Sequence, residues 1–144
     1  MEVRFEVAGE PKGKARPRFA RIGNGVRTYT SAETSNYEAF IKMAYLNAAG
    51  KTKLNGAICA EITGIFPIPK SESKRRRQKM LSGEIPHTKK IDCDNLAKTI
   101  LDALNGIAYD DDKQVCRLLV IKKYGEIPCV MVSLREVYDE KDTG

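Results

Sequence analysis

The chain has 144 residues, with 25 lysine and arginine residues against 19 aspartate and glutamate residues, which gives a formal net charge of +6. This length suits one compact domain that buries its own core, and a hydrophobic fraction of 42% argues against global disorder. No apolar run approaches the roughly 20 residues of a membrane span, and the N-terminus does not resemble a signal peptide. We therefore expect a cytoplasmic protein with an anionic partner.

Periodicity and turn signals divide the chain into strands and helices. A strand alternates apolar and polar residues with period two, whereas a helix repeats its apolar residues at spacings of three and four. The expected elements, in chain order, are a strand at 3–8, a basic hairpin or extended arm within about 10–30, a helix at 30–49, a strand at 56–66, a short basic helix at 72–81 capped by Ser71, a helix beginning at 94 or 95 and ending at 104, and two closing strands at 115–123 and 129–137. This order predicts one α+β or mixed α/β domain over residues 1–144, with a sheet of about four or five strands and two or three helices.

The longest predicted helix follows the basic arm. Thr30 and Glu33 fit a capping box at its start, and Gly50 is its expected C-terminal stop. Its apolar residues recur at spacings of three and four, which predicts a single buried face. That face comprises Tyr37, Phe40, Ile41, Ala44, Tyr45 and Ala48.

The segment IDCDNLAK, residues 91–98, carries the first candidate catalytic residues. In an extended segment Asp92 and Asp94 would point to the same side, and before a helix beginning at 95 both would lie at its positive end. Lys98 and Asp102 follow Asp94 at intervals of four, so they continue along one helix face. The corner between strand and helix is therefore expected to present two carboxylates and a lysine together.

A second acidic cluster, Asp110–Asp112, follows this helix and precedes the strand at 115. We expect the turn to return one of these acids toward Asp92 and Asp94. Crowded carboxylates repel one another unless a cation neutralises them, and ligands that are all oxygen suit Mg2+, with Mn2+ as a substitute. The alternative is that Asp94 and Asn95 only cap a helix and that Asp110–Asp112 is only a turn.

Two basic segments precede the acidic residues. Lys12–Arg27 interleaves cations with glycine and proline, and Lys70–Lys90 contains an arginine-rich helix and the single histidine. In a nuclease both segments would contact phosphates, and otherwise they are solvated faces. The candidate DNA-binding residues are Lys12, Lys14, Arg16, Arg18, Arg21, Arg27, Arg75, Arg76, Arg77, His87, Lys89 and Lys90. The four cysteines form no Cys-x-x-Cys pair, which argues against a structural zinc site.

Residues 91–115, IDCDNLAKTILDALNGIAYDDDKQV, resemble the signature of the RusA family of Holliday junction resolvases. That signature runs Pro-Asp-x-Asp-Asn-Leu-x-Lys, then Asp-Ala-Leu-Asn-Gly, then Asp-Asp-x-Gln-Val. The start GEPKGKARPR, the TYTS before the longest helix, the KRRR helix and the HTKK loop are also similar to phage-type members. The resemblance therefore covers most of the chain.

This resemblance implies both an activity and a set of site residues. The activity is Mg2+-dependent hydrolysis of DNA by a homodimer, which resolves a four-way junction through paired symmetric nicks and needs no organic cofactor. Such a dimer is physically reasonable because a two-fold enzyme matches a two-fold junction. Carried over residue by residue, the catalytic set is Asp92, Asp94, Asp112 and Lys98, and the metal ligands are Asp92, Asp94, Asp112 and Asp111.

The sequence also departs from the family pattern at two positions. Ile91 stands where the family often has proline, and Asp110 adds a third acid, so the last ligand could shift by one residue. A restriction-type nuclease is a second hypothesis, because Asp92 together with Asp111–Lys113 fits an Asp…Asp-x-Lys pattern. A third hypothesis, from another class, is a non-catalytic module that binds branched DNA and whose aspartates only cap and turn.

Overall fold

The structure is a computed structural model of the chain, and it describes residues 1–14, 18–22, 25–29 and 32–137. For residues 18–22 and 25–29 only the backbone is described. In chain order the elements are β1 (Glu2–Ala8), β2 (Arg18–Ile22), β3 (Gly25–Tyr29), α1 (Ala32–Ala49), β4 (Ile58–Phe66), α2 (Lys74–Ser82), α3 (Cys93–Ala103), the 3-10 helix η1 (Asp112–Gln114), β5 (Val115–Tyr124) and β6 (Cys129–Glu136). The predicted α+β class is confirmed, as a single small domain with a four-stranded mixed sheet and three α-helices.

The main sheet has the strand order β1-β6-β4-β5. Strand β6 pairs antiparallel with both β1 and β4, whereas β4 and β5 run parallel. A parallel pair needs a long crossover, and here the chain supplies one through α2 and α3 between β4 and β5. The carboxyl ends of β4 and β5 therefore lie at the same edge of the sheet.

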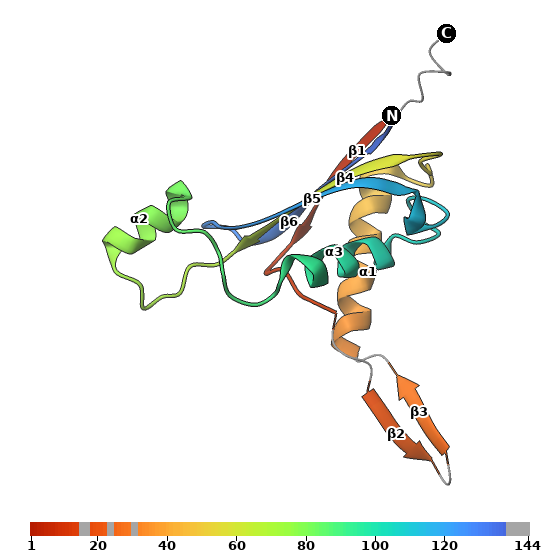
Figure 1. The fold of residues 1–144 in the computed structure, drawn as a ribbon, viewed down its shortest axis with the longest axis horizontal. Helices are drawn as coiled ribbons and strands as arrows, with labels where there is room; N and C mark the ends of the chain where they lie inside the picture. The colour runs from red at the N-terminus through yellow and green to blue at the C-terminus, as the bar shows by residue number, and fades with distance from the viewer. Residues whose placement is uncertain (15–17, 23–24, 30–31, 138–144) are drawn as a thin grey trace.

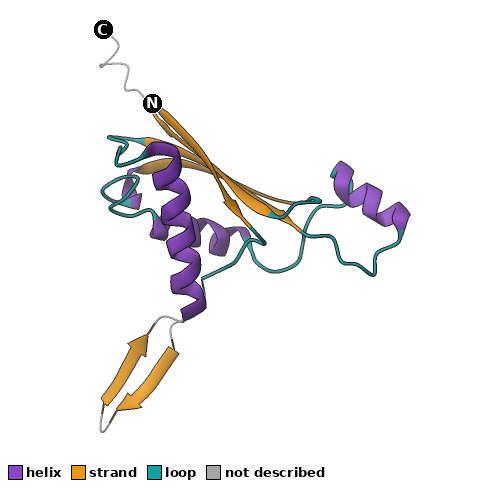
Figure 2. Ribbon diagram, turned by 180° about the vertical axis from the view of Figure 1, so that it is seen from behind, coloured by secondary structure: helices purple, strands orange, loops and turns teal. Residues whose placement is uncertain are grey.

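Helices α1 and α3 cover one face of this sheet (Figures 1 and 2). Alternation in β1 places Val3, Phe5 and Val7 on the covered face, where Ile100 of α3 and Ile41 of α1 are fully buried against the strands. The amphipathic pattern of α3 explains this packing, because its apolar residues occupy one side and its charged residues the other. The covered face is the main hydrophobic core and holds α3 in place.

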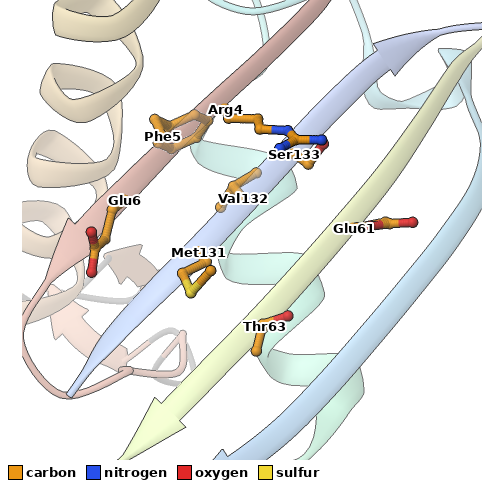
Figure 3. Close-up of a pocket in the computed structure, with 8 residues that line it drawn as sticks. All are labelled: Arg4, Phe5, Glu6, Glu61, Thr63, Met131, Val132 and Ser133. Atoms are coloured by element: carbon orange, nitrogen blue, oxygen red, sulfur yellow. The ribbon is translucent and has the colours of Figure 1, made fainter. Parts of the chain in front are cut away.

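No described helix covers the opposite face of the sheet, which we call the open face. Figure 3 shows Arg4 and Glu6 of β1, Glu61 and Thr63 of β4 and Met131 of β6 around a shallow hollow there. These residues alternate with the buried ones along each strand, as the period of a strand requires. The open face thus carries charges of both signs, and α3 lies on the other side of the sheet.

Helix α1 buries a narrower stripe than the sequence predicts. Tyr37, Ile41 and Tyr45 are buried as expected, but the side chain of Phe40 is 62% exposed and Ala48 is also exposed. The prediction of one buried face is therefore wrong at Phe40 and Ala48. The helix contacts β1 and α3 along one side only, so the positions at the margin of its apolar stripe remain outside the core.

Helix α2 stands apart from the sheet at the end of two long connections (Figure 1). Ser73, rather than the predicted Ser71, caps it by accepting a hydrogen bond from the backbone N–H of Arg76 at 3.2 Å. Gly83 closes it with φ of 88°, a left-handed conformation that favours glycine. Met80 is its one buried residue, so nearly the whole basic surface of α2 faces solvent.

Strands β2 and β3 form a separate two-stranded antiparallel sheet, and this confirms the predicted hairpin. We call residues 18–22 and 25–29 the hairpin arm. It projects from the start of α1 away from the main sheet in both views (Figures 1 and 2). The capping residue predicted for α1, Thr30, lies outside the described residues. None of the described helices is long and apolar enough to cross a membrane.

Candidate active site

Asp92 begins helix α3 as its N-cap residue. Its Oδ1 accepts a hydrogen bond from the backbone N–H of Asn95 at 2.8 Å, so the helix starts at Cys93, earlier than predicted. Asp94 consequently lies in the first helical turn instead of an extended segment. Both carboxylates are exposed at the end of the helix where the free N–H groups and the macrodipole favour negative charge and its ligands.

One charged face of α3 leads away from this end. Asp94, Lys98 and Asp102 follow one another at intervals of four residues, and Lys98 is exposed between the two acids. Asp102 is already paired, because its Oδ2 lies 3.1 Å from Nζ of Lys14. Lys98 is therefore the cation of α3 that stands one turn from Asp94 and faces solvent.

The second acidic cluster follows the C-terminal end of α3. Asp111 caps η1: its Oδ1 accepts from the backbone N–H of Lys113 at 2.8 Å, and Gln114 completes a capping box with it. The backbone N–H of Asp112 donates to Oδ1 of Asn105 at 2.8 Å, which holds Asp112 against the end of the helix. Asp110 pairs with Lys53 at the surface, Nζ to Oδ1 3.1 Å.

The local electrostatics single out Asp112 within this cluster. Burial raises the pKa of Asp112 above its ordinary value, the neighbouring Asp111 and Asp102 carboxylates raise it further, and a hydrogen bond with Asn105 opposes the shift. Burial and then the charge of Asp112 also raise the pKa of Tyr109, whose hydroxyl donates to the backbone oxygen of Leu101. Asp112 is thus an acid under repulsion from its neighbours, a situation that a bound cation would relieve.

The structure separates the two predicted halves of the metal site within one chain. Asp92 and Asp94 lie at the start of α3 and Asp112 beyond its end, and eleven residues of helix span about 15 Å. Ligands of one Mg2+ lie only about 2 Å from the ion. Among the residues that the structure describes, no three acidic, histidine or cysteine side chains are close enough to share one ion. The expectation that the turn returns Asp112 to Asp92 and Asp94 in the same chain is not met.

The basic helix α2 retains the surface predicted for it. Arg75 and Arg76 are exposed, although Arg76 pairs with Glu72 through Nε at 2.9 Å. Arg77 is partly buried and donates to the backbone oxygen of Pro69 at 3.2 Å. Within the described part of the chain, α2 is thus a projecting helix with several cations, and the acids Glu72 and Glu84 lie beside it.

The remaining candidate cations have different surroundings. Lys89 and Lys90 are exposed directly before Asp92. Lys12 is exposed, with Nζ 3.9 Å from Glu33, whereas Lys14 is partly buried against α3 and is engaged by acids. Arg16 lies outside the described residues, and the structure describes no side chain for Arg18, Arg21 and Arg27.

His87 is a buried residue rather than an exposed one. Its imidazole stacks on Phe66 with ring centroids 3.8 Å apart and meets Tyr124 edge to face at 4.9 Å. Burial, followed by the positive charges of Lys122 and Lys89, lowers the pKa of His87. The ring packs in a small aromatic cluster at the base of the α2 connections. This packing favours a structural role, and a DNA contact from His87 stays a prediction.

Comparison with known proteins identifies relatives of this chain. Residues 8–135 match the family model of endodeoxyribonuclease RusA. The chain belongs to the RusA family. It is therefore an endodeoxyribonuclease of the kind that resolves Holliday junctions, and RusA nucleases generally depend on a divalent metal ion. The chain is also similar to the uncharacterized protein YqaN of Bacillus subtilis (strain 168), with 34% identity over 137 residues that cover 94% of this chain and 96% of that protein.

Two asparagines of this RusA-family chain hold the acids, whereas the sequence suggested only a helix cap for Asn95 and a helix end at Asn105. Asn95 bonds Asp92 through its backbone, and Asn105 bonds the backbone of Asp112 through its side chain. Both lie inside the motifs that resemble the RusA signature, which was the available signal. Their partners depend on where α3 begins and ends, so their roles became visible only with the helix boundaries.

Proposed function

We propose that this RusA-family nuclease resolves four-way DNA junctions by Mg2+-dependent paired symmetric nicks. The observation that carries the proposal is the pair Asp92 and Asp94 at the positive end of α3, with Lys98 one turn further along the same exposed face. An all-oxygen donor set at this end suits Mg2+ or Mn2+. The family match over residues 8–135 supports branched DNA as the substrate, and we propose a cytoplasmic location for the activity.

Each residue has a separate task in this proposal. Asp94 and Asp92 would hold the ion, and Oδ1 of Asp92 also accepts the capping bond from Asn95. A bound Mg2+ would activate water and neutralise charge on the attacked phosphate. Lys98 places a positive charge where negative charge develops on that phosphate. The capping bond to Asn95 fixes the direction of the Asp92 carboxylate before the ion arrives.

The separation of Asp112 from the other two acids supports a homodimer with shared sites. We assign the third ligand to Asp112 because Asp111 and Asp102 repel its carboxylate, a repulsion that a bound cation would relieve. In a two-fold dimer, Asp112 of the partner subunit can complete the pair Asp92 and Asp94, and the relation is reciprocal. Each of the two sites would then need both subunits, which links paired nicking to dimerisation.

An exposed apolar stripe on α1 supports contact between two copies on the helical side of the sheet. Phe40, Met43 and Leu46 are all exposed, at spacings of three along α1. A contiguous apolar patch of this kind commonly marks an interaction surface. Phe40→Glu should therefore shift the protein from dimer to monomer in sedimentation, and an unchanged mass would place the dimer contact elsewhere.

The DNA-binding surfaces follow from the exposed cations. Arg75 and Arg76 on the projecting helix α2, with Lys89 and Lys90 before the acids, are proposed to contact phosphates on the arms of the junction. The other candidate DNA-binding residues from the sequence are Lys12, Lys14, Arg16, Arg18, Arg21, Arg27, Arg77 and His87. Of these we keep Lys12 and the hairpin-arm arginines, while Lys14, Arg77 and His87 have structural partners.

Cleavage of a labelled four-way junction, beside a linear duplex of the same sequence, tests the proposed function. Wild-type protein with Mg2+ should cut the junction alone, and Asp94→Asn should bind the junction but leave it intact. Equal cutting of the linear duplex would remove the claim of junction selectivity. Lys98→Ala should bind normally and cut more slowly, since the lysine acts on charge that develops during the reaction.

The hypothesis of a non-catalytic module that binds branched DNA loses support, because the chain belongs to a family of endodeoxyribonucleases. The capping bonds of Asp92 and Asp111 do not exclude catalysis, since each uses one carboxylate oxygen. If Asp94→Asn behaved like wild type in every assay, the assignment of Asp94 to the metal site would fail. The restriction-type hypothesis also loses support, since Asp111 caps the 3-10 helix Asp112–Gln114 instead of beginning a strand, and α3 intervenes.

A further inference from the structure

Asn95 connects the metal-binding turn to the segment that leads into the hairpin arm. Its backbone N–H donates to Oδ1 of Asp92 at 2.8 Å, and its own Oδ1 accepts from the backbone N–H of Lys14, also at 2.8 Å. Residues 11–14, which we call the arm root, precede the hairpin arm in the chain, and residues 15–17 between them lie outside the described residues. One side chain thus joins two segments that lie 81 residues apart.

The contact between the arm root and Asn95 is close as well as hydrogen-bonded. A Cβ atom added to Gly13 would lie 2.5 Å from Nδ2 of Asn95 and 2.9 Å from Cγ2 of Ile91. Both distances are shorter than a Cβ atom tolerates, so a side chain at position 13 would force Asn95 and Ile91 to shift. A larger residue at position 13 would displace the side chain of Asn95, whose backbone is bonded to Asp92.

Further bonds hold both partners of this contact. The hydroxyl of buried Thr99 donates to the backbone oxygen of Asn95 at 2.7 Å, so the first turn of α3 is bonded to the next turn of the same helix. Lys14 is fastened by its ammonium group, with Nζ 3.1 Å from Asp102 and 3.9 Å from Glu38. The arm root is therefore tied to α3 and α1, while Asn95 provides its link to the end that carries the acids.

We propose that Asn95 is a positioning residue that couples the arm root to the orientation of the Asp92 and Asp94 carboxylates. The proposal rests on the proposed function, in which the arm contacts phosphates and the acids hold Mg2+. A displacement of the arm root moves the Asn95 side chain, and the same residue holds the Asp92 carboxylate through its backbone. Conversely, fixing the carboxylates restrains Asn95 and stabilises its bond to the backbone of Lys14.

Hydrogen exchange at the Lys14 amide measures this coupling without relying on cleavage. In wild-type protein the amide should be protected, and added Mg2+ should slow its exchange further. Asn95→Leu removes the acceptor at similar size, so exchange should become about tenfold faster and insensitive to Mg2+. Asn95→Asp keeps an acceptor oxygen and should restore protection. Cys93→Ala, on the same turn and exposed, is the matched control and should behave like wild type.

Single-turnover cleavage then separates positioning from binding. Asn95→Leu and Gly13→Ala should each lower the cleavage rate constant on a four-way junction about tenfold, with little change in Kd. The double variant should be no slower than the slower single variant, because both changes break one contact.

Several results would overturn the coupling and leave the proposed function intact. These are wild-type rates for Asn95→Leu, a loss confined to Kd, or a Lys14 amide whose exchange ignores Mg2+. If wild-type protein never cuts the junction, the proposed function fails instead, and the exchange measurement with Mg2+ still decides the coupling. An unprotected Lys14 amide in the wild type would reject the coupling directly.

Discussion

Substitution of His87 distinguishes a packing role from a DNA-binding role for this side chain. The imidazole is 8% exposed and contacts the rings of Phe66 and Tyr124. Its Nδ1 atom is buried and has no hydrogen-bond partner among the described residues. His87→Ala removes both ring contacts, whereas His87→Phe keeps an aromatic ring and removes the unpartnered nitrogen.

The expected magnitude follows from these contacts. Each aromatic pair contributes about 1 kcal/mol beyond its buried area, and truncation of a large buried side chain to alanine costs about 2–5 kcal/mol. We therefore expect His87→Ala to lower the free energy of unfolding by about 3 kcal/mol, or the melting temperature by roughly 10 °C. His87→Phe should be close to wild type at alkaline pH, because the lost nitrogen offsets the change in shape.

The pH dependence gives a second, independent signature. Burial, with Lys122 and Lys89 nearby, lowers the pKa of His87 below its ordinary value of 6.5, so the unfolded chain binds a proton that the folded protein does not. The stability from neutral His87 is fully present above about pH 6.5 and is lost as the pH falls below it. Urea unfolding at about pH 8, 6.5 and 5 should show this loss in wild type and not in His87→Phe.

The same variants can refute this reasoning. Junction affinity of His87→Ala, measured well below its melting temperature, should equal that of wild type. A variant that keeps its stability but loses affinity for DNA would show that His87 contacts the substrate after all. Identical pH profiles for wild type and His87→Phe would contradict the lowered pKa.

Three further perturbations test other parts of the structure. Tyr109→Phe removes a buried hydroxyl that donates to the backbone oxygen of Leu101 at 2.6 Å, so urea unfolding should show a loss of about 1 kcal/mol, and an unchanged value would mean that this bond does not stabilise the fold. Gly64→Ala places a Cβ 2.8 Å from Cδ2 of the fully buried Leu96, and the free energy of unfolding should fall by about 1–3 kcal/mol because α3 must move from β4; an unaltered melting curve would refute the tight contact. Arg75→Gln should reduce the slope of log Kd against log salt for DNA by about 1, whereas an unchanged slope would remove α2 from the phosphate contacts.

Local patterns predicted most of the fold. The alternation of Val3, Phe5 and Val7 predicts β1, and the hydrophobic spacing within 94–104 predicts the helix that packs as α3. The parallel pairing of β4 with β5 did not follow from these patterns, because strand order depends on how the crossover packs. The burial of Phe40 was overestimated because periodicity shows which face of a helix is apolar but not how much of that face contacts the core.

The candidate site was predicted in its residue types more than in its geometry. The two acidic clusters and Lys98 were visible in the sequence, but the length of α3 decides how far apart Asp94 and Asp112 lie. The burial of His87 and the ion pair of Lys14 with Asp102 involve partners distant in sequence, and a single sequence contains no signal for such pairs. The sequence does not distinguish lysine and arginine residues that face solvent from those that pair with an acid in the folded protein.

One mixing experiment tests the central claim most directly: that Asp92, Asp94 and Asp112 form shared metal sites that cut a four-way junction. Asp94→Asn and Asp112→Asn are each assayed alone on a strand-labelled junction with Mg2+, and then after subunit exchange as a mixture. We predict paired symmetric nicks by wild type, no cleavage by either variant alone, and single nicks by the mixture, since a mixed dimer retains one intact site. If the mixture were as inactive as each variant alone while wild type is active, the shared site would be contradicted. If wild type bound the junction but never cut it, the nuclease activity itself would be contradicted.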